Sequence, residues 1–151
     1  MKKMLLFALF CIAITPKLVA QTNEEDAIKK TINNLFTGMK QGDSTIARLA
    51  FADNCIMQTI STKTGTALLK TASVNEFINF IGTAHKEKFD ERIVFTKILI
   101  DGPLAVVWTD YKFYVDEKFS HCGVNSFQLV KGDAGWKIVY LIDTRRKDLC
   151  N

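Results

Sequence analysis

The fold is decided by residues 92–145, RIVFTKILIDGPLAVVWTDYKFYVDEKFSHCGVNSFQLVKGDAGWKIVYLIDTR. This stretch contains four runs rich in β-branched and aromatic residues, and turn-forming residues separate them. Because the connections are too short for a parallel crossover, the sequence predicts an antiparallel meander of four strands. One face of such a sheet has to be covered, and only the earlier part of the chain can cover it. The predicted strands are 92–100, 104–115, 118–130 and 136–143.

The part of the chain before the meander is predicted to be mainly helical, so the fold class is α+β. Asn23 can cap a helix whose apolar residues follow a helical period, and Gly42 is a typical residue just past its end. Ser73 and Glu76 form a capping box for a later helix. The predicted order is a long helix up to Gly42, a short helix at 43–50, a turn at 51–54, a strand at 55–60, a loop at 61–72 and a helix after Ser73.

The first 20 residues have the three parts of a secretory signal peptide. Residues 2–3 are basic, residues 4–14 are apolar, and residues 18–20 end in a small side chain before Gln21. Eleven apolar residues are too few for a helix that spans a bilayer, which needs about 20. We therefore expect an exported protein, periplasmic or extracellular, with a single domain at 21–151 and no stable membrane anchor after processing. An uncleaved anchor is the alternative.

The charge of the processed chain argues against a nucleic-acid partner. The full chain has 20 basic and 16 acidic residues, and three of the basic residues fall in the first 20, which leaves 17 against 16. A nucleic-acid surface needs clustered Lys and Arg. The one dense basic cluster, at 145–147, lies at the end of the chain.

Three cysteines remain after the predicted cleavage: Cys55, Cys122 and Cys150. An oxidising compartment allows one disulfide and leaves one thiol, and the sequence does not choose the pair. Buried, inert thiols are the alternative for Cys55 and Cys122. With two histidines and no CxxC motif, the sequence predicts neither a metal site nor a cofactor.

A tight turn at 116–117 sets the expected register of the middle hairpin. It would pair Trp108 with Asn125, and alternation would then place one set of side chains on a single face. That face is apolar at one end and mixed polar at the other, as the wall of a ligand cavity is. The residues expected on it are Val106, Trp108, Asp110, Lys112, Tyr114, His121, Asn125, Phe127 and Leu129.

The other face of the sheet is predicted to be exposed and apolar enough to form a homodimer. The residues expected on it are Val107, Tyr111, Phe113, Val115, Val124 and Val139.

Asp143 and Arg145 have two interpretations. A simple register of the last hairpin puts both on the face opposite His121, and only a β-bulge would bring them into the same cavity. The alternative is a partly exposed ion pair.

His121 also has two interpretations. It is either a general base or ligand partner, or a strand histidine bonded to a carboxylate such as Asp110. The sequence favours a structural or ligand-positioning role. If the protein is an enzyme, the candidate catalytic residues are His121, Asp110 and Asp143.

The order of elements resembles the nuclear transport factor 2-like (NTF2-like) superfamily. The 51–54 turn that follows Gly42-Asp43 resembles the entry into the first strand of that fold, and Gly135-Trp136-Lys137-Ile138 resembles the GWKI of many SnoaL-like members. The segments 119–123 and 143–146 resemble exported bacterial proteins labelled putative lumazine-binding. The resemblance implies a cone-shaped, curved antiparallel sheet wrapped around N-terminal helices, with a pocket. This fold serves isomerases, cyclases, hydrolases and non-catalytic binding modules alike.

The first functional prediction is an exported, non-catalytic domain that binds a small apolar or aromatic molecule between the meander and the helices. The alternatives are an isomerase- or hydrolase-type enzyme that pairs His121 with an aspartate, and a dimeric interaction module. The expected ligand-binding residues are Trp108, Asp110, His121, Asn125, Phe127, Asp143 and Arg145.

Export can be tested on the protein secreted by its own host. Because the small residue at the end of the apolar segment marks the cleavage position, N-terminal sequencing of the mature protein should begin at Gln21. Recovery of Met1 on the mature protein would contradict the prediction.

Overall fold

The computed structural model describes residues 16–62 and 65–150. The predicted apolar segment at 4–14 lies outside these residues. The first helix begins at Pro16, before the predicted cleavage position, and cleavage stays a prediction. Within the described part of the chain, no helix is both long and apolar enough to cross a membrane.

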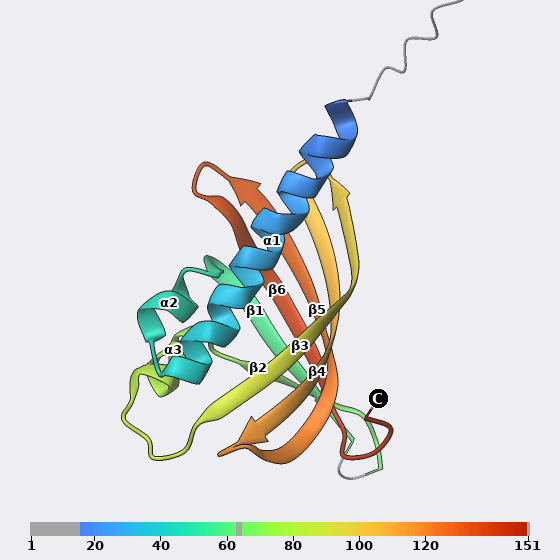
Figure 1. The fold of residues 1–151 in the computed structure, drawn as a ribbon. Coiled ribbons are helices and arrows are strands. Elements are labelled where there is room, and N and C mark those ends of the chain that lie inside the picture. The colour runs from blue at the N-terminus through green and yellow to red at the C-terminus, as the bar shows by residue number, and fades with distance from the viewer. Residues whose placement is uncertain (1–15, 63–64, 151) are drawn as a thin grey trace, which may run out of the picture.

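Six strands form one curved, open sheet in the order β2-β1-β6-β5-β4-β3 (Figure 1). The predicted four-strand meander is confirmed as β3 to β6, with every neighbouring pair antiparallel. β1 lies beside β6 and runs parallel to it, whereas β2 pairs antiparallel with β1 at the edge of the sheet. The strands are β1 Phe51–Ser61, β2 Leu68–Ala72, β3 Phe89–Asp101, β4 Leu104–Val115, β5 Lys118–Gly132 and β6 Gly135–Arg145.

Three helices cover the concave side of the sheet: α1 Pro16–Gln41, α2 Ser44–Arg48 and α3 Val74–Gly82. The long α1 lies across the sheet, and α2 and α3 sit together near the end of α1 (Figure 1). Gly42 has φ 69° and ends α1 as predicted. The predicted cap of α3 is confirmed, because the Glu76 amide donates to Ser73 Oγ at 3.3 Å.

The main core lies between α1 and the sheet. Ile28, Ile32 and Leu35 follow the helical period along one side of α1 and are buried. They pack in the same cluster as side chains from the concave face of the sheet. The sheet residues of this cluster are Phe51, Ala105, Val107, Phe127, Leu129, Trp136, Ile138 and Leu141.

Two local predictions were wrong. Residues 51–54 are the start of β1, and part of the predicted loop at 61–72 forms β2. All five residues of β2 are exposed, so the segment has no pattern of burial that the sequence could show. Its strand conformation comes from pairing with the edge of β1.

A one-residue bulge in β5 overturns part of the predicted register. The turn forms as expected, with positive φ at Asp116 and Glu117, but Ser120 has no partner on β4, so the pairing slips by one residue beyond it. Trp108 therefore pairs with Ser126 instead of Asn125. Because a slip of one residue moves a side chain to the other face, β4 presents the face opposite to the predicted one. The residues that were predicted on the cavity face but lie on the outer face are Val106, Trp108, Asp110, Lys112 and Tyr114. The residues that were predicted on the outer face but lie on the concave side are Val107, Tyr111, Phe113 and Val115.

A second bulge lies in β6. Ile138 pairs with Leu129 and Tyr140 pairs with Gln128, which leaves Val139 without a partner. This bulge is of the kind that the predicted register needed to bring Asp143 and Arg145 to the cavity face.

The C-terminal tail is tied to the outer side of β5. Cys122 forms a disulfide with Cys150, which resolves the choice that the sequence left open. Cys122 and Arg146 also exchange two backbone hydrogen bonds of 2.9 Å. Cys55 is free and partly buried, and burial raises the pKa of its thiol to about 11.

Candidate ligand site

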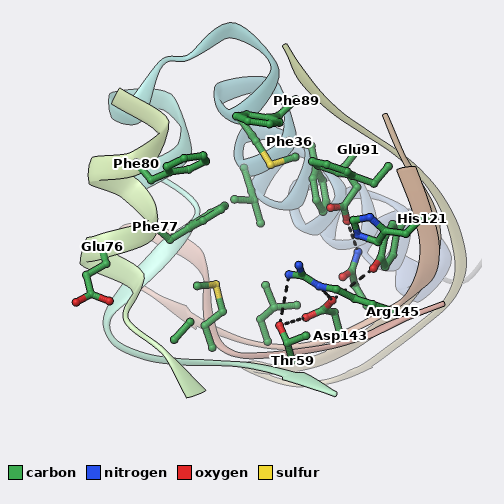
Figure 2. Close-up of a pocket in the computed structure, with 18 of the residues that line it drawn as sticks. Phe36, Thr59, Glu76, Phe77, Phe80, Phe89, Glu91, His121, Asp143 and Arg145 are labelled. Atoms are coloured by element: carbon green, nitrogen blue, oxygen red, sulfur yellow. Dashed lines mark hydrogen bonds and ion pairs between the residues drawn. The ribbon is translucent and has the colours of Figure 1, made fainter. Parts of the chain in front are cut away.

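A cavity of about 530 Å³ lies between the concave face of the sheet and helices α1 and α3. Figure 2 shows Glu91, His121, Asp143 and Arg145 on one side, and the rings of Phe77 and Phe80, with Glu76 beside them, on the other. Its apolar lining residues are Leu35, Phe36, Met39, Met57, Phe77, Phe80, Phe89, Phe113 and Leu141. Its polar lining residues include Thr59, Glu91, Tyr111, His121, Asn125, Asp143 and Arg145.

Asp143 is the centre of the polar side. Thr59 Oγ1 donates to its Oδ1 at 2.5 Å, and Arg145 Nε donates to its Oδ2 at 3.0 Å. The Asp143 side chain is only 13% exposed, whereas that of Arg145 is 53% exposed. Burial disfavours the charge of Arg145, but the adjacent Asp143 prevails and raises the pKa of the guanidinium. Asp143 and Arg145 are therefore the predicted ion pair and also part of the cavity wall.

Tyr111 reaches this cluster because its partner across the sheet is a glycine. Tyr111 pairs with Gly123, and a Cβ added at Gly123 would lie 1.8 Å from the Thr144 carbonyl oxygen and 2.7 Å from the Tyr111 ring. The phenol therefore donates to the Thr144 carbonyl at 2.8 Å and lies 3.4 Å from Asp143 Oδ2. Burial, followed by the negative charge of Asp143, raises the pKa of Tyr111, and the phenol stays protonated.

Glu91 is a second carboxyl in the cavity. Its Oε1 accepts a hydrogen bond from Asn125 Nδ2 at 2.8 Å, and Asn125 is directly opposite Asp143 in the sheet. Burial raises the pKa of Glu91 to about 7. The hydrogen bond from Asn125 works against this rise, and the negative charge of Asp143 adds to it.

His121 lies at the edge of the polar side and contacts aromatic rings. Its ring centroid is 4.9 Å from that of Phe113 and 5.8 Å from that of Tyr111. Its Nδ1 is 3.1 Å from Ser120 Oγ, which is the hydroxyl of the bulge residue.

The structure brings four of the predicted site residues together and leaves three apart. His121, Asn125, Asp143 and Arg145 line the cavity. Trp108 is 47% exposed on the outer face, and Asp110 is exposed on the same face, because the Ser120 bulge moves them there. Phe127 is fully buried in the core below the cavity, with its ring 6.3 Å from that of Phe36.

Three polar residues of the cavity, Thr59, Glu91 and Tyr111, were not predicted from the sequence. Glu91 comes just before the predicted first meander strand at 92–100, and the predicted register assigned Tyr111 to the wrong face.

The arrangement offers two carboxyls, one guanidinium and one amide at the end of an aromatic chamber. Such a site can bind the polar edge of a flat molecule, and Glu91 can also accept or donate a proton near neutral pH. Among the described residues, no group of three or more His, Cys, Asp or Glu side chains is placed to hold a metal ion.

The curved sheet, the helices and the cavity between them define an NTF2-like domain. An NTF2-like protein with a cystatin-like fold from Novosphingobium aromaticivorans has a TM-score of 0.69 at 10% identity, over 93% of this chain and 94% of that chain. An NTF2-like protein of unknown function from Shewanella baltica OS155 has a TM-score of 0.64 at 19% identity, over 84% of this chain and 97% of that chain. At these identities the likeness shows the fold alone.

Residues 23–141 match the family described as "Putative lumazine-binding", and the chain belongs to this family. No curated protein gives a significant match.

The raised pKa of Glu91 predicts a pH-dependent stability. The folded protein holds the Glu91 proton up to about pH 7, whereas the ordinary pKa is 4.5, so the free energy of unfolding should fall as the pH rises through this window. Glu91→Gln removes this component. Relative to wild type, the variant should gain stability between pH 4.5 and pH 8, by on the order of 3 kcal/mol at most. Urea unfolding at both pH values measures the change.

The matched control is Glu87→Gln, the same substitution at an exposed residue between α3 and β3. Its stability relative to wild type should change little with pH. An equal pH dependence in wild type and Glu91→Gln would contradict the prediction.

Proposed function

We propose that this protein is an exported small-molecule-binding domain. Its ligand has a flat apolar body, which lies among the phenylalanines, and one polar edge, which faces Glu91, Asn125 and Asp143. The observation that carries the proposal is the cavity itself. Its volume of about 530 Å³ lies within the usual range for ligand pockets, and a mainly apolar lining with a few convergent polar groups is typical of them.

The family description supports a ligand of this shape. Lumazine is a flat, fused bicyclic ring whose edge carries both hydrogen-bond donors and acceptors. The carboxyl of Glu91 and the amide of Asn125 offer matching groups on one wall. A heteroaromatic ring is therefore the ligand type that we favour.

Export is supported by the three-part N-terminal sequence and by the Cys122–Cys150 disulfide. Disulfides form and persist in oxidising compartments. The proposed location is periplasmic or extracellular.

An acid–base enzyme is the second candidate function, and Glu91 is the observation that favours it. A carboxyl with a pKa of about 7 is matched to proton transfer at neutral pH. Asp143 and His121 lie in the same cavity, whereas Asp110 is on the other face and drops out of the candidate pair.

His121 provides the test between binding and turnover. Native mass spectrometry of protein purified from its own host should detect a retained small molecule. If the function is binding, His121→Ala should weaken the affinity for that molecule by about 1–3 kcal/mol, because a polar group of the buried ligand loses its partner. If the function is catalysis, the same change should leave binding largely intact and lower turnover by about 10²–10⁴-fold.

The control for this test is the other histidine of the described chain. His85 borders a neighbouring hollow instead of the cavity, so His85→Ala should leave the affinity close to that of wild type. Product formed by the wild type would overturn the non-catalytic proposal, and a chain that retains nothing would overturn the binding proposal.

We also propose that the outer face of the sheet forms a homodimer, through residues different from those predicted. Alternation places Val94, Leu99 and Trp108 on this face, in the neighbouring strands β3 and β4. They are 64%, 55% and 47% exposed, which is a large apolar area for one surface. Two copies related by a two-fold axis would cover the same patch on both subunits.

Trp108→Asp tests the dimer. A buried, unpaired charge in the centre of an apolar interface should prevent association, so light scattering should report a dimer for wild type and a monomer for the variant. Leu49→Asp, at a residue that is 54% exposed on the far side of the sheet, should remain dimeric. A wild type that is monomeric at high concentration would show that the proposal is wrong.

A further inference from the structure

The polar side of the cavity contains two carboxyl groups and one basic group. Its charged groups are the carboxyls of Glu91 and Asp143 and the guanidinium of Arg145. Arg145 pairs with Asp143 at 3.0 Å. The described hydrogen bond of Glu91 is with a neutral amide, that of Asn125.

We propose that this cavity binds an organic cation: an ammonium or amidinium group on a flat apolar body, held at Glu91 and Asp143 and enclosed by aromatic rings. The inference rests on the proposed binding function and names the chemical class of its ligand.

The charge distribution around Glu91 favours a positive group. Arg145 lies on the β6 side next to Asp143 and Thr59, whereas Glu91 comes from β3. Burial has the largest effect on the pKa of Glu91 and raises it. Of the two nearby charges, Asp143 raises this pKa by more than Arg145 lowers it. A bound cation would supply the opposite charge that an ionised, partly buried Glu91 needs.

The aromatic lining favours the same class of ligand. Phe36, Phe89 and Phe113 line the same cavity as Glu91, and the stacked rings of Phe89 and Phe113 have centroids 6.1 Å apart. The faces of aromatic rings attract cations, by about 0.5–1 kcal/mol at exposed sites and more when the cation is desolvated. A carboxylate at one end of a chamber of rings is therefore suited to an amine that carries an apolar body.

Binding of a cation at Glu91 is coupled to loss of the Glu91 proton. The affinity should rise with pH, because the carboxyl has to ionise to pair with the ligand. The other titratable and charged groups that face this end are Tyr111 from β4, His121 from β5, and Asp143 and Arg145 from β6, while α3 contributes Glu76. Protonation of His121 at low pH would also oppose a cation, so the variant at Glu91 is needed to separate the two effects.

The experiment compares three probes that share one ring: 1-naphthylmethylammonium, 1-naphthylmethanol and 1-naphthoate. Isothermal titration at pH 8 should show the ammonium binding about tenfold or more tighter than the alcohol, and the carboxylate binding weakest. The affinity for the ammonium should fall about tenfold or more from pH 8 to pH 5.5. In Glu91→Gln, the preference for the ammonium over the alcohol should be lost and the fall with pH should become much smaller.

The matched control is Asp110→Asn, which removes one carboxylate from the exposed outer face and should preserve the preference for the ammonium. Equal or tighter binding of the alcohol or the carboxylate would overturn the cation inference and leave the binding function standing. Binding of none of the three probes would also overturn the inference. The binding function itself is then decided separately, by whether the protein from its own host retains a molecule in native mass spectrometry.

Discussion

One-residue bulges at Ser120 in β5 and at Val139 in β6 determine which side chains line the cavity. Side chains alternate along a strand, so one unpaired residue exchanges the two faces of everything beyond it. The bulge in β5 places Tyr111 opposite Gly123 on the concave side, and the bulge in β6 turns Asp143 to the same side. Without them, the inner face would present a different set of side chains over the same backbone curve.

The polar cluster is stable in an apolar cavity because most of its groups form hydrogen bonds with protein groups. Asp143 receives hydrogen bonds from Thr59 and Arg145, and the Tyr111 hydroxyl is bonded to a backbone carbonyl. Glu91 differs, because its described partner is a neutral amide and burial raises its pKa to about 7. A carboxyl whose pKa is raised by burial lowers the stability of the fold at neutral pH. Groups with strongly shifted pKa values cluster at functional sites.

The disulfide supports the same end of the sheet from outside. Cys122 directly follows His121, and the tail residue that pairs with it, Arg146, directly follows Arg145. The cross-link therefore closes a loop that contains the cavity residues Asn125, Asp143 and Arg145. A disulfide stabilises a fold chiefly by lowering the conformational entropy of the unfolded chain. Here the restricted segment includes the strands that position the polar groups.

The sequence by itself determined the meander, the helix that covers it and the capping of α3, because these follow from local periodicity and turn chemistry. It also identified the tight turn at 116–117 and the two residues, Asp143 and Arg145, whose placement would depend on a bulge. The confirmed features share one property, which is that each depends on residues near one another in the chain.

Only the tertiary structure decided which face of β4 looks inward, because a bulge at Ser120 leaves no periodic signal in the sequence. The edge strand β2 was likewise invisible, since its conformation comes from hydrogen bonds to β1 and not from burial. The placement of Glu91 has the same origin. Its carboxyl became part of a site because the curved sheet brings β3 within reach of Asn125 on β5, and distances across a curved sheet are set by packing around α1 and not by spacing along the chain.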